Sequence, residues 1–507
     1  MSFSLKEQIC KKFVLFENLI VFTIQSKNPD FLMFLLLAVI YGITRLPAIF
    51  LYPLVRDEAI YSIVITEQIL NPTLIPTFLS YSIGWKPQLF YWIYSMFAQL
   101  PLPLEIAYRF PSFLFGFATL IPLYYLLRNI GASRNVSFFT LIVFLFSFIT
   151  VYPHTTVLAD SLMFFFMMCG LYFYTDKNPS GWKFTAASFF SFAAFFVKPV
   201  IPIMVPLLAI AYYYYGDKKI FKNQIFLLSL LAIPLAFALH YLMLDAVGLA
   251  EENYILDISK RLAIADDIGN SIWIALGSFN MLIMSFGIWF ALSLFGLWKH
   301  WKSNRFMTVW YAMIIFPILT GFYMPWYYLP VMPAISYFAV ILLLKWDGKE
   351  KMDALFTAFI SMAIIATIVL SSFVYFGLYY SYNPEKEAGN FLSGKENVLI
   401  IGEYASSVVA YKILGEYRTD GKWKDFGWIL ILNHDSAAIP DFIEDYHTDK
   451  YETKNGSFSS IFTNKTIFRK DTDITKFDYI VIVSEETNNT YGSIVFNQSN
   501  IIIYDIE

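Results

Sequence analysis

Three charged residues, Arg56, Asp57 and Glu58, follow the first long apolar segment of the chain, and Lys86 comes about thirty residues later. Charges beside a bilayer are costly, so such a cluster predicts function. A carboxylate here can accept a proton from an acceptor hydroxyl as a general base. A lysine or arginine can hold a phosphate group as a point charge or a fork. In the structural alternative, the triplet is a solvated helix end.

Other charges enter the outer ends of later apolar segments. Asp160 and Lys198 are expected at the same depth as Asp57, so these side chains can converge on one site. The structural alternative for Asp160 is stabilisation of a helix dipole, and Lys198 faces either lipid headgroups or a phosphate. Arg45 lies inside the first apolar segment, where it reaches to the membrane surface or faces an internal polar cavity.

Composition places these residues in a membrane protein. The 507-residue chain is 58% hydrophobic and only 15% charged, against roughly 25% in soluble domains. Its net charge of −3 gives no field that would indicate nucleic acid as a partner. Cys10 and Cys169 lie in separate parts of the chain, so we expect neither a disulfide framework nor a cysteine metal site.

The apolar segments predict an all-α polytopic domain. Spanning a bilayer takes about 20 apolar residues. Segments near that length begin at about residues 31, 109, 136, 158, 184, 200, 224, 271, 306, 326 and 354. The sequence therefore predicts about eleven transmembrane helices. In the first outer loop, the run from residue 89 to residue 100 is too short to span, so we expect an interfacial helix with its tyrosines and tryptophan at headgroup depth.

Charged loops predict the orientation of the chain in the cell membrane. Every short basic loop falls on one side if the N-terminus is cytoplasmic, while the acidic loops fall on the other. An odd number of spans then places the C-terminus outside the cytoplasm. The two long loops, residues 53–108 and about 245–270, are both outer loops. We therefore expect function on the outer face.

The chain divides into three predicted parts. Residues 1–30 form a cytoplasmic or interfacial segment, residues 31–380 the transmembrane domain, and residues 381–507 a small extracytoplasmic α/β domain. The last part is predicted from short apolar runs separated by polar stretches. Its strand-like runs are residues 398–401, 428–432, 479–483 and 501–504, and its helix-like run is residues 405–414.

An ordered set of motifs carries a family resemblance. In chain order, the set is Arg45-Leu-Pro, Asp57-Glu58-x-x-Tyr61, Lys86-Pro87-x-Leu-x-Tyr91-Trp92, Arg109-Phe-Pro-Ser, Ala159-Asp160-Ser161, Val197-Lys198-Pro199 and Trp326-Tyr327-Tyr328-Leu329-Pro330. This set resembles the ArnT/PMT-like (dolichyl-phosphate-mannose-protein mannosyltransferase-like) membrane glycosyltransferases of the GT-C fold class. The resemblance covers about residues 30–345, and the C-terminal tail lies outside it.

The resemblance implies transfer of a sugar from a polyprenyl (dolichyl or undecaprenyl) phosphate carrier, with inversion at the anomeric carbon. The acceptor would be a lipid, a protein or a glycan at the outer face of the bilayer. By similarity, Asp57 would orient or deprotonate the acceptor hydroxyl, with Asp160 as a second acid. Adjacent residues on a helix point about 100° apart, so either Asp57 or Glu58 is expected to face elsewhere.

The resemblance also assigns the cations and the cavity. The residues expected to bind the donor phosphate are Lys86, Arg56, Lys198 and Arg109, and those expected to line the substrate cavity are Tyr61, Arg45, Tyr327 and Tyr328. Lys198 departs from the family pattern, because Pro199 stands where the family often has glycine. No DxD motif is present, so a required divalent metal ion is not indicated, and no other cofactor is indicated. Metal use is not uniform in the family, so a divalent metal ion stays open.

Two other classes of function are open from the sequence. A transporter or flippase of polyprenyl-linked sugars would need polar groups through both halves of the membrane, whereas the intramembrane charges here lie toward the outer side. A surface adhesion or sensor protein would carry its function in the tail, where no repeat or ligand motif is found. The motifs GxGxxG, GxxxxGK[ST], GxSxG and HExxH of soluble enzymes are missing.

Overall fold

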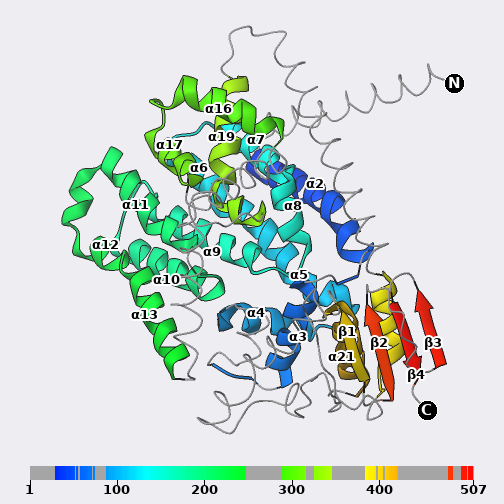
Figure 1. The fold of residues 1–507 in the computed structure, drawn as a ribbon. Coiled ribbons are helices and arrows are strands. Elements are labelled where there is room, and N and C mark those ends of the chain that lie inside the picture. Colours follow the sequence, from blue (N-terminus) through cyan, green and yellow to red (C-terminus); the bar gives the residue numbers. More distant parts are fainter. Residues whose placement is uncertain are drawn as a thin grey trace, which may run out of the picture.

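The computed structural model describes residues 29–51, 53–54, 57–70, 72–74, 87–199, 201–246, 287–315, 325–344, 383–395, 398–402, 406–420, 478–483, 493–498 and 501–505. Within these ranges, a helical body carries a small sheet at one end, and the helices between residues 204 and 245 lie at the opposite end (Figure 1). The predicted span at about residue 354 lies outside the described residues, as do residues 1–28 and the start of the span at about residue 271.

The helical body follows the chain order. Its first part contains α2 (Pro29–Leu51), α3 (Asp57–Leu70), α4 (Gln88–Ala98), α5 (Leu104–Ala118), α6 (Leu120–Asn129), α7 (Arg134–Leu145), α8 (Phe148–Thr155), α9 (Ala159–Tyr174) and α10 (Gly181–Val197). Its second part contains η2 (Ile201–Ile203), α11 (Met204–Tyr215), η3 (Lys218–Lys222), α12 (Gln224–Ser229), α13 (Ala232–Asp245), α16 (Ile288–His300), α17 (Arg305–Ala312), η5 (Pro325–Val331) and α19 (Met332–Leu344).

Several helices of the described part are long and apolar enough to cross a membrane. Four stretches pass this test: Asp30–Phe50, Leu104–Asn129, Gln224–Asp245 and Tyr327–Leu344. A fifth arises if α7 and α8, bent by 67°, form one broken span. Three further apolar helices, beginning at Ala159, Gly181 and Ile201, are shorter. A multi-spanning membrane protein is therefore supported, and the count of about eleven spans stays a prediction.

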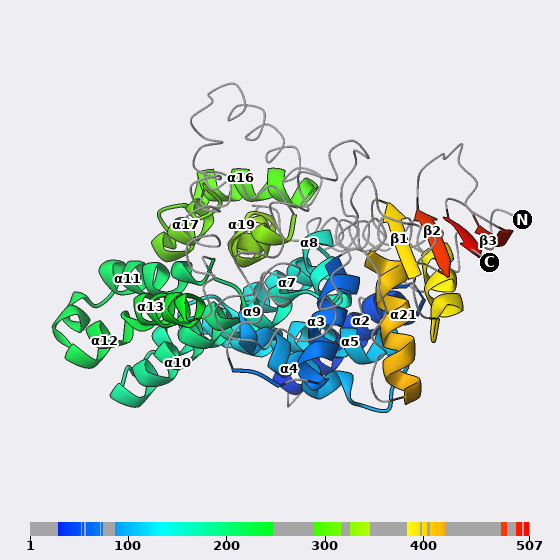
Figure 2. The same cartoon turned by 60° about the horizontal axis from the view of Figure 1, so that its bottom comes forward.

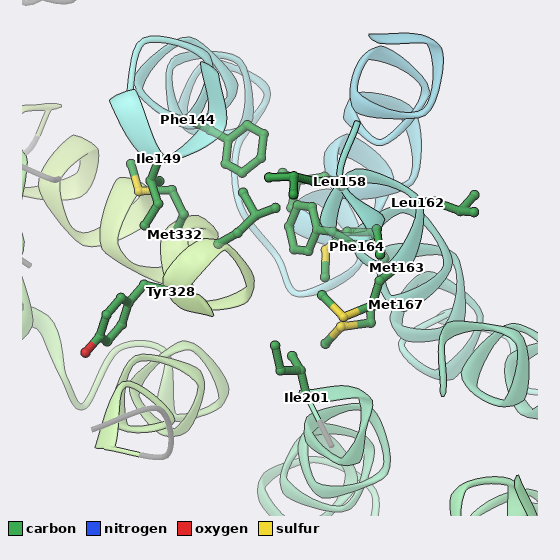
Figure 3. Packing of buried hydrophobic residues seen from close by; sticks show 14 of the residues in the cluster. Phe144, Ile149, Leu158, Leu162, Met163, Phe164, Met167, Ile201, Tyr328 and Met332 are labelled. Carbon is green, nitrogen blue, oxygen red and sulfur yellow. The ribbon is translucent and has the colours of Figure 1, made fainter. Parts of the chain in front are cut away.

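Helix α9 lies at the centre of the body, where it packs against α5, α6, α10 and α11. Its apolar side chains are buried on almost every side, as expected for a helix that is hydrophobic all round. Figure 3 shows Phe164 and Met167 of α9 around one interior with Ile149 of α8, Ile201 of η2 and Met332 of α19. This packing fixes the start of α9, which carries Asp160.

A four-stranded mixed sheet closes the described part of the chain. Its strands are β1 (Val398–Gly402), β2 (Tyr479–Val483), β3 (Ser493–Gln498) and β4 (Ile501–Asp505), in the order β1-β2-β4-β3. β1 and β2 are parallel, with Val398 opposite Tyr479, and the other pairs are antiparallel. Parallel neighbours need a long crossover, and α21 (Ser406–Asp420) lies in that crossover.

The small α/β part confirms three of the four predicted strands. The predicted run at residues 428–432 lies outside the described ranges. Strand β3 was not predicted, because its side chains are largely exposed and it ends in the polar pair Asn497 and Gln498. Helix α21 packs against α3 of the helical body, and the two helices lie close together in both views (Figure 1, Figure 2).

Candidate functional site

The first charged pair of the site joins Glu58 and Arg109. Arg109 Nε donates to Glu58 Oε1 and Nη2 donates to Oε2, both at 2.8 Å, and both side chains are buried. This two-bond fork is the geometry in which an arginine holds a carboxylate most firmly. Glu58 lies in the first turn of α3, where a negative charge also suits the helix dipole. The pair therefore fixes the start of α3 on α5.

The same pair also forms hydrogen bonds with three backbone groups, two carbonyls and one N–H. Arg109 Nη2 donates to the carbonyl of Pro53 at 2.7 Å, and Nη1 lies 3.4 Å from the carbonyl of Ile49. From the other side, the Val157 N–H donates to Glu58 Oε1 at 2.9 Å. The end of α2, the start of α3, α5 and the connection before α9 thus meet at one buried charge pair.

The second charged pair joins Asp160 and Lys198. Lys198 Nζ donates to Asp160 Oδ1 at 2.6 Å, and both side chains are buried. The ammonium also lies 4.1 Å from the ring centroid of Tyr327, a cation–π contact. Lys198 precedes Pro199, which disfavours helical backbone at the residue before it, and Lys198 is indeed extended at the end of α10. The Val-Lys-Pro sequence therefore places the lysine at a helix end.

The connection between α8 and α9 brings the two pairs together. Val157, which donates to Glu58, is three residues before Asp160. Tyr94 of α4 donates to the neighbouring Leu158 carbonyl at 2.8 Å, and its hydroxyl lies 2.7 Å from Ser112 Oγ of α5. Burial raises the pKa of Tyr94 above its usual 10, and the negative charge of Asp160 acts in the same direction. Helices α3, α4, α5 and α9 thus surround one polar region.

Tyr94 and Tyr91 correct one expectation about the first outer loop. Both lie in α4, which confirms a helix in this run, but both are fully buried. They pack on Phe90 instead of facing lipid headgroups. This burial is not predictable from the sequence, because an aromatic helix suits the membrane interface and a protein core equally well.

Arg45, a residue of α2, contacts the bend between α7 and α8. Its guanidinium is buried, donates to the Leu145 carbonyl and lies 3.2 Å from Thr150 Oγ1. It also lies 4.7 Å from the ring of Tyr41. A sharp helix bend leaves carbonyl groups without helical partners, so Arg45 satisfies backbone at the bend. These contacts place its guanidinium against the bend of α7 and α8.

The aromatic residues predicted for the cavity have different surroundings. Tyr61 packs edge-on against Phe90, with ring centroids 5.5 Å apart, in the contact between α3 and α4. Tyr327 is half-buried beside Lys198, while its neighbour Tyr328 is fully buried. Figure 3 shows the Tyr328 hydroxyl directed away from the labelled methionines. Tyr327, a predicted cavity residue, is therefore in contact with a charged pair.

The side chains of three predicted site residues lie outside the part that the structure describes. Arg56 and Lys86 lie outside the described residues, and for Asp57 the structure describes the backbone as the first residue of α3. Among the described residues, no group of three or more His, Cys, Asp or Glu side chains lies close enough to hold a metal ion. The buried acids Glu58 and Asp160 have cationic side chains as partners.

Comparison with known proteins gives a family match over the part of the chain that carries this site. Residues 31–240 match the family model described as dolichyl-phosphate-mannose-protein mannosyltransferase. This range contains both charged pairs, whereas Tyr327 lies beyond it. A search of curated protein sequences gave no match.

Solved structures share the fold at low sequence identity. ArnT from Cupriavidus metallidurans bound to undecaprenyl phosphate aligns with 94% of this chain and 98% of its own, with a TM-score of 0.56 and 13% identity. The apo ArnT structure has a TM-score of 0.52 at 14% identity, over 76% of this chain and 84% of its own.

An oligosaccharyltransferase from Archaeoglobus fulgidus, tethered with an acceptor peptide, has a TM-score of 0.52 at 12% identity. That alignment covers 77% of this chain and 64% of the oligosaccharyltransferase. The family match and the shared fold together confirm the resemblance of this chain to the ArnT/PMT-like glycosyltransferases of the GT-C fold class.

Proposed function

We propose that this chain is an inverting glycosyltransferase that moves a sugar from a polyprenyl-phosphate carrier to a hydroxyl of a lipid, protein or glycan acceptor. The family match over residues 31–240 and the GT-C fold support a polyprenyl-phosphate-dependent glycosyltransferase. The N-terminus would lie in the cytoplasm, and transfer would take place at the outer face. ArnT bound to undecaprenyl phosphate is the neighbour whose ligand motivates the choice of donor.

The observation that carries the proposal is the junction of two buried charge pairs at the starts of α3 and α9. Glu58 with Arg109 and Asp160 with Lys198 are linked through the short connection that contains Val157. Buried charges are expensive to maintain, and the Glu58–Arg109 pair lies where α3 begins with Asp57. Sugar transfer from a phosphate leaving group needs both a base and a positive charge, and this region supplies both types of residue.

Asp57 is the proposed base. Glu58, next to it, accepts from Arg109 with both carboxylate oxygens and also from Val157. Protonation of Glu58 during catalysis would oppose these contacts. Successive helix positions point about 100° apart, so the first and second positions of α3 face different directions. We therefore assign proton abstraction to Asp57 and the positioning of α3 to Glu58.

Lys198 is the proposed cation for the donor phosphate, together with Lys86 and Arg56 of the first loop. An ammonium carries three donor hydrogens, and in the described part of the chain Lys198 donates to the Asp160 carboxylate and faces the ring of Tyr327. As the bond to the sugar breaks, negative charge grows on the phosphate, and a fixed cation lowers the energy of that state. Asp160 would hold the ammonium in place. For Arg109 we propose positioning of α3 in place of phosphate binding.

Radiolabelled polyprenyl-phosphate sugars test the proposal directly. The purified full chain would be incubated with a panel of such donors and with membrane extract as a source of acceptors. We expect label to move from at least one donor to an acceptor. Absence of transfer from every donor would contradict the proposal, and movement of intact lipid-linked sugar between bilayer leaflets would instead indicate the flippase.

A further inference from the structure

The peptide group between Pro53 and Leu54 is held from two sides. Helix α2 ends at Leu51 and α3 begins at Asp57, so backbone groups between the two helices need other partners. The Pro53 carbonyl accepts from Arg109 Nη2 and the Leu54 N–H donates to the hydroxyl of Tyr411, both at 2.7 Å. In a trans peptide these two groups point in opposite directions, so this peptide plane is fixed against rotation.

Tyr411 comes from the C-terminal α/β part of the chain. It lies on α21, which packs against α3, and its side chain is 3% exposed. The helix over residues 383–392 packs against α21 at Tyr411. A Cβ at Gly389 would lie 2.6 Å from the Cβ of Tyr411 and 2.5 Å from the Val408 carbonyl. Only glycine permits this close approach, so the neighbouring helix holds α21 and Tyr411 in place.

The hydroxyl of Tyr411 is satisfied on both of its functions. It accepts from Leu54 and donates to Glu105 Oε1 at 3.1 Å. Glu105 Oε1 also accepts from Lys386 Nζ at 2.5 Å, which adds a second link to the C-terminal part. Burial and the nearby Glu105 charge raise the pKa of Tyr411 well above 10. The phenol therefore keeps its proton and donates at any physiological pH.

Glu105 and Arg109 are four residues apart on α5, about one turn of the helix. One face of α5 thus reaches the Pro53 carbonyl through Arg109 and, through Glu105, the tyrosine that binds the Leu54 N–H. These contacts form a closed ring just before Asp57. The ring consists of the Pro53–Leu54 peptide, Arg109, Glu105 and Tyr411, and of these only Tyr411 belongs to the C-terminal part.

We infer that Tyr411 is a positioning residue for the proposed base Asp57, acting through the backbone of Leu54. The inference rests on the proposed function, and it gives the C-terminal α/β part a role in transfer. Reacting groups must be placed within a fraction of an ångström, and small misplacements reduce turnover strongly. Without the tyrosine hydroxyl, the peptide plane three residues before Asp57 would lose one of its two anchors.

Tyr411→Phe tests the inference, because it removes the hydroxyl and keeps the ring. The matched control is Tyr417→Phe on the same helix, where the side chain is only half-buried. Amide hydrogen exchange over residues 50–60 reports on Leu54 without any need for activity. We expect faster exchange of this peptide in Tyr411→Phe, and unchanged exchange in Tyr417→Phe.

Steady-state kinetics supply the second readout. We expect kcat of Tyr411→Phe to fall about threefold to tenfold, the effect of one lost hydrogen bond, with the KM for the polyprenyl-phosphate donor unchanged. Glu105→Gln, which keeps an acceptor for the phenol, should give a smaller fall. Wild-type kcat together with wild-type exchange in Tyr411→Phe would overturn the inference about Tyr411 and leave the proposed function standing. Absence of transfer by the wild-type chain would instead overturn the proposed function.

Discussion

The two buried charge pairs differ in the number of contacts that hold each cation. Arg109, on α5, makes a two-bond fork to Glu58 and also binds the Pro53 carbonyl, so it holds α5 to the start of α3 and to the connection after α2. Lys198 makes one bond to Asp160 and rests on the half-buried ring of Tyr327. A forked arginine fixes geometry, whereas a lysine is a point charge that can serve a ligand as well. We therefore propose that Arg109 positions the site and that Lys198 binds the donor phosphate.

Removal of Arg109 should give the largest loss of stability. Arg109→Met leaves the Glu58 carboxylate buried without its main partner, a change that costs about 3–5 kcal/mol. Thermal unfolding in detergent would measure the loss. The double variant Glu58→Gln/Arg109→Met removes the stranded charge and should recover part of the stability. A single variant as stable as the wild type would contradict the positioning role.

Removal of Lys198 should affect transfer more than binding of the acceptor. In Lys198→Met, we expect kcat to fall about 100-fold to 1,000-fold, as when one group that stabilises the transition-state charge is lost. Asp160→Asn/Lys198→Met provides the control, because it neutralises the stranded acid. This double variant should recover stability but not kcat. Recovery of transfer would indicate that Lys198 serves only to neutralise Asp160.

Replacement of Arg109 by lysine tests the geometry of the two-bond fork. Arg109→Lys keeps the charge but offers a point charge where two parallel bonds are needed. We expect the pair to lose about 1–2 kcal/mol, roughly the difference between a charge-assisted fork and a single bond. Chemical denaturation of the purified chain would measure this loss. An unchanged midpoint would show that charge alone holds α3 on α5.

The smallest expected effect concerns the ring beneath Lys198. Tyr327→Leu removes a cation–π contact at a half-exposed position, worth about 0.5–1 kcal/mol. Binding of undecaprenyl phosphate should weaken about twofold to fivefold by isothermal titration. Tyr327→Phe keeps the ring and should bind like the wild type. Equal weakening in both variants would assign the effect to the hydroxyl and not to the ring face.

The sequence predicted the helical membrane body and most of the small sheet. Bilayer thickness sets the length of apolar segments, so helices such as α2 and α13 are visible without any knowledge of packing. The strands around Val398, Tyr479 and Ile501 are short apolar runs in a polar tail. The family motifs then selected a fold class that length and hydropathy leave open.

The partners within the site were beyond sequence reasoning. Glu58 and Arg109 are 51 residues apart, and Asp160 and Lys198 are 38 apart. Local patterns report spacing along one helix, and they say nothing about which charges on separate helices meet. Tyr411 gave no signal at all, because a tyrosine on a helix of the C-terminal part usually belongs to its own core.

The central claim is that Asp57 carries out chemistry while Glu58 holds α3, and one paired assay tests it. Transfer from the best radiolabelled donor would be measured for Asp57→Asn and Glu58→Gln, with undecaprenyl phosphate binding and thermal unfolding measured on the same samples. We expect Asp57→Asn to lose about 100-fold or more of kcat while it binds the lipid phosphate and unfolds like the wild type. Glu58→Gln should lower the unfolding temperature and retain more of its transfer. Full transfer by Asp57→Asn would contradict the account.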